Sequence, residues 1–180
     1  MSAPITSYRA PFGLGQSHEV DAEVARKLLE IALSQGGDYA DLFFEYSAHG
    51  SLAFEEGITR SASRGVSMGL GVRVQKGDAT GYAHVEDLSF DAMKRAAETA
   101  ARIATTGQGV HVEKIQPLEL PHRYQLGRLT LDEAGLDKRA LLERAAKHLL
   151  AFDPRIEKAQ ASFAESVREI LVVTSDGRWA

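Results

Sequence analysis

The segment between Val66 and Gln75 constrains the fold of this chain more than any other. Its apolar residues (Val66, Met68, Leu70, Val72, Val74) alternate strictly with Ser67, Gly69, Gly71, Arg73 and Gln75. A period of two places all the apolar side chains on one face of a β-strand, whereas a helix would scatter them. The segment therefore predicts a sheet with one apolar face, which a second layer must cover.

Further strands are expected on both sides of this segment. Residues 38–47 also alternate, and His49-Gly50 is expected to turn the chain so that 51–60 returns as a second strand. Gly77-Asp78 is expected to turn the chain into a hairpin partner at 79–85. Two strands are expected near the end, at 156–165 and 169–174. Because short turns join the front strands, we expect them to be antiparallel.

Three helices are predicted from apolar residues spaced three and four apart. The first covers 19–35, with Ser17 as its N-cap, and the second covers 90–105 and is rich in alanine. The third covers 138–152, and its expected inward side chains are Leu141, Leu142, Ala145, Leu149 and Phe152. The fold class is therefore α+β: a two-layer sandwich of a mostly antiparallel sheet with helices on one face.

The expected domain organisation is an N-terminal arm at 1–18 followed by one domain at 19–180. The stretch 106–136 is predicted to be a long irregular loop, which is usually functional or wraps a partner. The sequence stops at Ala180 in what we expect to be the start of another strand. We therefore expect the chain to be the front part of a longer protein.

Composition excludes several function classes. The 180 residues include no cysteine, which removes disulfides and thiolate metal sites, and the formal net charge is −4. The basic residues are scattered instead of forming one basic face, so direct binding to nucleic acid is disfavoured. No apolar run approaches the length of a membrane helix and no secretion signal is visible, so a cytoplasmic location is expected.

No catalytic site is predicted within these residues. A zinc-peptidase helix needs a second histidine soon after a His-Glu pair, but His18-Glu19 is the only such pair and none follows it. The glycines at 69 and 71 share the polar face of a strand, where glycine weakens a sheet. They indicate either a bulge or bend, or another backbone lying close. In the second case a sheet edge could bind an extended peptide, with Arg73 meeting a carboxylate. The alternative is an edge that is protected by the expected continuation of the chain beyond Ala180.

Several segments, in this order and spacing, resemble the N-terminal domain of the TldD/PmbA family, whose members are called modulators of DNA gyrase. They are Asp38–Glu45, Gly69–Val74, Gly77, Thr80–Ala83, Asp87–Ser89, the alanine pairs 96–97 and 100–101, and Glu169–Gly177. The similarity spans roughly residues 20–178 and favours the TldD branch.

The resemblance implies the N-terminal scaffold, substrate-channel and dimerisation domain of a zinc metallopeptidase that cleaves unfolded or small peptides. It implies a TldE/PmbA-type sister subunit, or a second copy, as partner, with zinc held by a C-terminal domain outside this chain. Gly69, Gly71, Arg73 and Tyr82 are the candidate substrate-binding residues. The alternative function is a non-catalytic module that regulates a partner such as DNA gyrase by direct contact.

Overall fold

The computed structural model describes residues 8–104, 112–118 and 129–180. The elements in chain order are α1 (Ala22–Leu33), β1 (Tyr39–Glu55), β2 (Ile58–Lys76), β3 (Ala79–Val85), α2 (Phe90–Ala104), β4 (Gln116–Pro117), the short 3₁₀ helix η1 (Thr130–Asp132), α3 (Gly135–Phe152), β5 (Gln160–Thr174) and β6 (Arg178–Trp179). They form two compact units. Unit 1 holds Tyr8, 47–66 and 129–168, and unit 2 holds 9–46, 67–104, 112–118 and 169–180.

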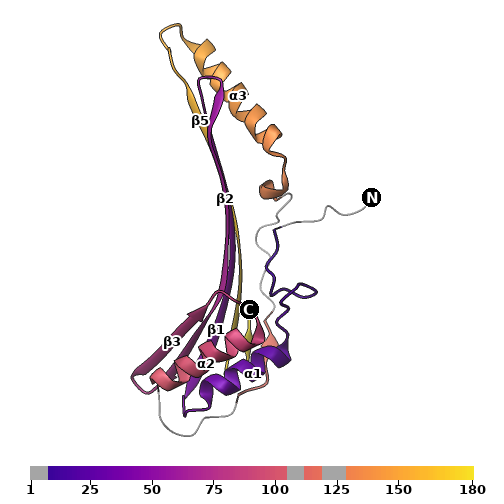
Figure 1. Ribbon diagram of the computed structural model, residues 1–180, viewed down its shortest axis with the longest axis vertical. Coiled ribbons are helices and arrows are strands. Elements are labelled where there is room, and N and C mark those ends of the chain that lie inside the picture. The colour runs from indigo at the N-terminus through magenta and orange to yellow at the C-terminus, as the bar shows by residue number, and fades with distance from the viewer. Residues whose placement is uncertain (1–7, 105–111, 119–128) are drawn as a thin grey trace. The chain divides into compact units, whose positions relative to one another are not determined.

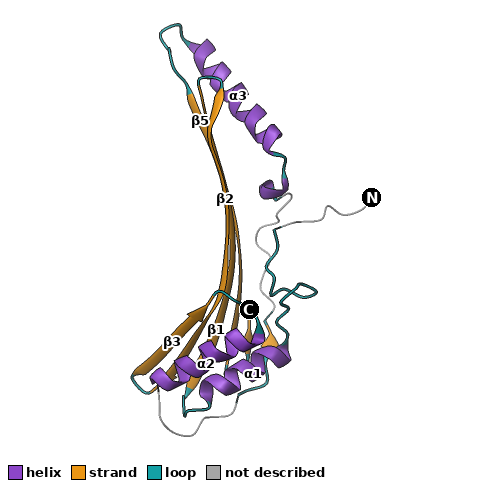
Figure 2. Ribbon diagram, viewed as in Figure 1, coloured by secondary structure: helices purple, strands orange, loops and turns teal. Residues whose placement is uncertain are grey.

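The strands join in the order β3-β2-β1-β5-β6-β4 (Figure 1). β2 and β3 are antiparallel, with Arg73 opposite Tyr82 and Gly71 opposite His84. β5 pairs antiparallel with β6, while the short β4 pairs parallel with it. The predicted α+β class with a mostly antiparallel sheet is confirmed (Figure 2).

The front of the sheet contains fewer and longer strands than expected. β1 runs through His49 and Gly50, so the turn expected there is wrong, and the chain turns at Glu56-Gly57 instead. Both turn residues have positive φ, 50° and 81°, the combination of a two-residue type I′ hairpin. Gly50 has a packing role, because a Cβ there would lie 2.9 Å from the Glu165 carboxylate.

The core of unit 2 lies between the sheet and two helices. In Figure 1, α1 and α2 lie side by side over one face of the sheet. Ala40, Leu42 and Phe44 of β1 and Leu70, Val72 and Val74 of β2 are fully buried beneath them. The alternation thus identified the buried face correctly from Leu70 to Val74, but Val66 and Met68, which belong to the same pattern, are 52% and 39% exposed. The opposite residues of β1 and β2 form what we call the open face.

The helix boundaries differ slightly from those predicted. α1 begins at Ala22, and its N-cap is Asp21, whose side chain accepts a hydrogen bond from the Val24 N–H at 2.8 Å; Ser17 is not the cap. α2 approaches the sheet closely because its inner surface is alanine. A Cβ at Gly81 of β3 would lie only 2.0 Å from the Ala100 carbonyl oxygen, so this position requires glycine.

α3 belongs to unit 1, and its inner surface is narrower than predicted. Lys138, Leu142 and Ala146 are buried, and Leu142 and Ala146 form a small apolar cluster with Phe54 of β1. Four of the five expected inward positions are wrong: Leu141, Leu149 and Phe152 are 45%, 46% and 80% exposed, and Ala145 is exposed as well. In unit 1 the helix buries only residues spaced four apart, so its neighbouring apolar side chains remain exposed.

The ends of the chain also differ from the predictions. The two strands expected at 156–165 and 169–174 are one strand, β5, and β6 follows the turn at 175–177. Residues 9–20 form turns within unit 2, where the rings of Phe12 and Phe44 lie 5.6 Å apart. Much of the loop predicted at 106–136 lies outside the described residues, and 112–118 and 129–135 contribute β4, η1 and the start of α3.

No helix among the described residues combines the length and apolarity that membrane crossing requires.

Candidate functional site

The open face of unit 2 carries a shallow cavity of about 250 Å³. Side chains of β1, β2 and β3 share this face because directly paired residues lie on the same side of a sheet. The lining consists of Phe43 and Glu45, residues 67–71, and Tyr82 with residues 84–86. The cavity therefore brings together three of the four predicted site residues: Gly69, Gly71 and Tyr82.

The two glycines allow close approach by two different groups. A Cβ at Gly69 would lie 2.7 Å from the Val85 carbonyl oxygen, so another backbone does lie close there, as one of the two explanations predicted. A Cβ at Gly71 would lie 2.8 Å from the Tyr82 hydroxyl oxygen and 3.2 Å from a ring carbon. The tyrosine ring therefore leans across Gly71, back over β2.

Two stacked rings make the cavity partly aromatic. The centroids of Tyr82 and His84 are 6.3 Å apart with planes inclined by 24°, and Tyr82 is 58% exposed. Phe43 of β1 is also partly exposed on this face. Apart from Tyr82, these aromatic residues were not among the sequence-based candidates, although His84 lies two residues after Tyr82 in the same strand.

Arg73 lies beside the cavity and not in its lining. Its Nε and Nη2 donate to one oxygen of Asp41 at 2.8 and 2.6 Å, and this hydrogen bond raises the pKa of Arg73. The carboxylate that Arg73 contacts is therefore one from its own sheet. A substrate carboxylate would have to share the guanidinium with Asp41.

A serine-hydrolase motif crosses the same strand without forming a nucleophile elbow. Gly65-Val66-Ser67-Met68-Gly69 has the Gly-x-Ser-x-Gly spacing, although the expectation from the sequence was that no elbow of this type is present. An elbow is a sharp turn between a strand and a helix, but these residues lie within β2. His84 pairs with Gly71, four residues or roughly 13 Å along the strand from Ser67. Proton transfer between Ser67 and His84 is excluded at that separation.

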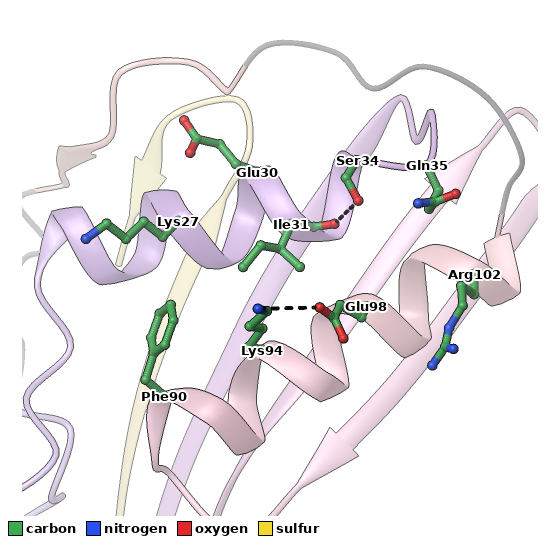
Figure 3. Close-up of a pocket in the computed structure, with 9 residues that line it drawn as sticks. All are labelled: Lys27, Glu30, Ile31, Ser34, Gln35, Phe90, Lys94, Glu98 and Arg102. Atoms are coloured by element: carbon green, nitrogen blue, oxygen red, sulfur yellow. Dashed lines mark hydrogen bonds and ion pairs between the residues drawn. The ribbon is translucent and has the colours of Figure 1, made fainter.

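A larger hollow of about 610 Å³ lies between α1 and α2 (Figure 3). Its charged side chains are mostly paired along their own helices, as in Lys94–Glu98 at 3.8 Å and Lys27–Glu23 at 2.6 Å. Figure 3 also shows Ser34 donating from its hydroxyl to the Ile31 carbonyl. These are ordinary features of solvated helix surfaces, and they bring no reactive groups together.

Unit 1 contains a buried ion pair that the sequence did not reveal. Lys138 of α3 contacts Glu165 of β5 at 2.5 Å, with side chains only 9% and 5% exposed. The second carboxylate oxygen of Glu165 is buried and has no hydrogen-bond partner in the described structure. A cavity of about 370 Å³, lined also by Arg64, adjoins the pair.

The described residues do not fit a zinc ion. They contain no group of three or more His, Asp or Glu side chains placed to hold a metal. His111 and His122 lie outside the described residues.

Comparison with known proteins places these features in a family. Residues 40–104 match the family model for PmbA/TldA metallopeptidase domain 1. The metalloprotease TldD homologue of Haemophilus influenzae is 30% identical over 162 residues, which cover 85% of this chain and 32% of that protein. The homologue from Buchnera aphidicola of Acyrthosiphon pisum is 28% identical, and the match covers 87% of this chain and 32% of that protein. The chain thus spans about a third of the length of these relatives.

Solved structures agree on the fold. One is a protein of Bacteroides thetaiotaomicron whose name describes it as a modulator of DNA gyrase. The match covers 88% of this chain and 37% of the Bacteroides chain, with a TM-score of 0.63 and 16% identity. The match to TldE of Thermococcus kodakarensis covers 88% of this chain and 35% of TldE, with a TM-score of 0.60 and 19% identity. Identities this low support the fold alone. Together with the family model and the TldD homologues, they confirm the resemblance found in the sequence: the chain is similar to the N-terminal domain of the TldD/PmbA family.

Proposed function

We propose that this chain is the scaffold, dimerisation and substrate-channel domain of a TldD-like zinc metallopeptidase that cleaves unfolded or small peptides. In this proposal, zinc and the general base belong to a C-terminal domain outside the chain. The chain spans 32% of the length of the TldD homologues, and its described residues hold no metal-binding cluster. We therefore assign the chain a role in subunit assembly and in forming the substrate channel.

The observation that carries the assembly role is the exposed apolar stripe of α3. Leu141, Ala145, Leu149 and Phe152 are spaced by four, four and three residues, so they lie along one side of the helix. All four are exposed, Phe152 by 80%. A continuous apolar stripe on a surface helix is the usual mark of a protein interface.

The proposed partner for this stripe is a TldE/PmbA-type sister subunit, with a second copy of the chain as the other possibility. The similarity to TldE of Thermococcus kodakarensis supports the first choice, because related subunits with the same fold can form matching interfaces. The open face would then contribute to the channel wall, with Gly69, Gly71, Arg73 and Tyr82 facing the peptide.

The first test is peptidase activity of the full reading frame with its sister subunit, on an unfolded peptide, with and without a zinc chelator. We expect the full protein to cleave, the chelator to stop cleavage, and residues 1–180 alone to be inactive. Chelator-sensitive cleavage by the isolated 180 residues would contradict the proposal.

A matched pair of variants in the full protein tests the assembly role. Leu149→Asp places a charge in the apolar stripe, while Leu150→Asp makes the same change on another side of α3 at nearly equal exposure, 46% against 44%. We expect Leu149→Asp to weaken subunit association at least about tenfold in analytical ultracentrifugation, and Leu150→Asp to leave it nearly unchanged. Equal effects would show that the stripe is not the interface.

A second candidate function is a non-catalytic module that binds and regulates DNA gyrase. Two solved structures of this fold, from Bacteroides thetaiotaomicron and Thermotoga maritima, belong to proteins named as modulators of DNA gyrase. Direct regulation requires a complex with gyrase that persists at physiological salt when peptidase activity is blocked. A pull-down with purified gyrase and the full protein in chelator distinguishes the two functions.

A further inference from the structure

One carboxylate oxygen of Glu165 is buried in unit 1 and has no hydrogen-bond partner among the described residues. The other oxygen of the same carboxylate contacts Lys138 at 2.5 Å, and both side chains are at least nine-tenths buried. Buried polar atoms in folded proteins have a partner in the large majority of cases, so an unpartnered one calls for a water, an ion or a ligand. A carboxylate oxygen accepts hydrogen bonds, so its missing partner is a donor.

The space beside Glu165 is larger than a single water requires. Glu165 lines the cavity of about 370 Å³ in unit 1, whereas one water occupies about 30 Å³ in the liquid. Pockets that bind small molecules begin at about 300 Å³. The last torsion of a glutamate side chain is broad, so a small rotation of the carboxylate presents its unpartnered oxygen to a donor in the cavity. The cavity can therefore hold a small molecule that donates to Glu165.

A second charged group, the guanidinium of Arg64, lines the same cavity. Its Nη2 donates to the Leu131 carbonyl oxygen at 3.1 Å, and its Cζ lies 5.2 Å from the centroid of the Tyr8 ring. Neither of these contacts neutralises its positive charge. Lys138 adds another positive charge beside Glu165, so the cations of the lining outnumber its carboxylate by one.

The mixture of charges selects the kind of molecule that fits. A simple ammonium ion would donate to Glu165 but would be repelled by the two cations, and a simple carboxylate would bind Arg64 but face the unpartnered oxygen. A zwitterion matches both, because its ammonium group donates to Glu165 and its carboxylate accepts from the guanidinium of Arg64. Leu52 and Phe163 also line the cavity, so an apolar side chain has a surface to pack on.

We propose that the cavity of unit 1 binds a small zwitterion of the amino-acid class, with its ammonium group on Glu165 and its carboxylate on Arg64. An apolar side chain of this ligand packs on Leu52 and Phe163. The inference goes beyond the proposed function, because every residue of the cavity lies in unit 1 and binding requires no zinc, no sister subunit and no cleavage.

The test compares three molecules that share one apolar chain. L-leucine carries both charged groups, isoamylamine lacks the carboxylate, and 4-methylpentanoate lacks the ammonium group. Each is titrated into the nitrogen-15-labelled 180-residue chain and followed by two-dimensional NMR, whose spectra also show whether the chain is folded. A molecule of about nine non-hydrogen atoms binds in the millimolar range at ordinary ligand efficiencies, so the titration extends to about 50 mM.

We expect leucine to shift the amide signals of Gly50 and Arg64, which line the cavity. Each of the two control molecules should bind at least about tenfold more weakly, because it leaves one charged group of the site unmatched.

A matched pair of variants locates the binding. Arg64→Gln removes the charge that holds the carboxylate, so it should weaken leucine at least about tenfold and leave isoamylamine binding at least as strong. The control is Arg60→Gln, the same change in the same strand at a residue that pairs with Glu55 and Glu56. We expect it to bind leucine like the unchanged chain. Glu165→Gln should weaken leucine but not 4-methylpentanoate; if breaking the buried pair unfolds this variant, the Arg64 comparison decides alone.

Three results would overturn the inference. If leucine at about 50 mM leaves the signals of Gly50 and Arg64 unchanged in a folded chain, the cavity holds water only. If leucine and either control molecule bind equally, the site does not recognise both charges. If Arg64→Gln and Arg60→Gln have the same effect, leucine binds elsewhere. None of these results involves activity or subunit association, so they leave the metallopeptidase proposal to its own tests.

Discussion

The buried ion pair between Lys138 and Glu165 leads to a stability prediction. It separates the contribution of the intact pair to the free energy of unfolding from the cost of leaving one of the two charges unpaired. We consider Lys138→Met, which keeps a long unbranched side chain over the same surface and removes the charge. The carboxylate of Glu165 is 5% exposed and Lys138 is its charged partner at 2.5 Å. After the substitution, the buried carboxylate would have lost its ion-pair partner.

The magnitude follows from this burial. Removing one partner of a buried pair costs about 3–5 kcal/mol, because the remaining ion has lost water without gaining a partner. The second oxygen of Glu165 already has no hydrogen-bond partner, so the desolvation of the pair is incompletely compensated. We therefore expect the double variant Lys138→Met/Glu165→Leu to be much less destabilised than Lys138→Met, and within about 1 kcal/mol of the unchanged chain or more stable.

The assay is urea unfolding followed by circular dichroism, combined with hydrogen exchange of the α3 amides. Exchange is added because it reports any local opening of unit 1 separately from global unfolding. If Lys138→Met costs less than about 1 kcal/mol, or if the double variant is as unstable as the single one, the reasoning from burial is refuted. In either case Glu165 would have to be hydrated in solution.

Three other substitutions test the packing, the turn and the titration described above. Gly81→Ala should lower the unfolding free energy by about 1–3 kcal/mol, because its Cβ would lie 2.0 Å from the Ala100 carbonyl oxygen; an unchanged melting temperature would contradict this close contact. Gly57→Ala should cost about 1–2 kcal/mol in urea unfolding, because φ is 81° in the β1–β2 turn, and equal midpoints would show that the turn relaxes. Burial and the Asp41 carboxylate raise the pKa of Tyr39 above 10.0, so its contribution to stability is present below about pH 10 and is lost as the pH rises through the folded-state pKa. Tyr39→Phe should therefore reduce the loss of stability between about pH 9 and pH 11, measured as the shift in urea midpoint, and an unchanged loss would refute the assignment.

The sequence predicted the parts of the fold that follow from periodicity. Alternation at 38–47 and 70–75 correctly separated the buried face of β1 and β2 from the open face, although Val66 and Met68 of the same pattern are exposed. The alanine spacing placed α2 within one residue. These patterns succeed because a strand or helix must present one apolar side to the core, whatever its neighbours are.

The errors arose where contacts with residues that are distant in the sequence decide the structure. His49-Gly50 has turn composition, but Glu165 from a distant strand occupies the space above Gly50, so the strand continues. The α3 stripe has the spacing of a core, yet no described element covers it, and a pattern alone cannot reveal which apolar face meets its partner within the same chain.

The candidate site was predicted only in part. Gly69, Gly71 and Tyr82 share one cavity because alternation and register fix which side chains meet across strands. Arg73 lies apart from it because Asp41, 32 positions earlier, holds the guanidinium, and charge pairing across strands is not visible in a local pattern. The Lys138–Glu165 pair escaped for the same reason, since its members lie in α3 and β5.

The rings that lean across glycines have a consequence for how this domain changes over generations. His49 covers Gly65 and Tyr82 covers Gly71, so in each case a large side chain occupies the volume that its cross-strand neighbour lacks. Neither member of such a pair can grow unless the other shrinks. In a set of homologous sequences, side-chain size at position 71 should therefore vary inversely with size at 82, and size at 65 inversely with size at 49. The backbone of the strand would keep its shape while the larger side chain of each pair changes from one position to the other.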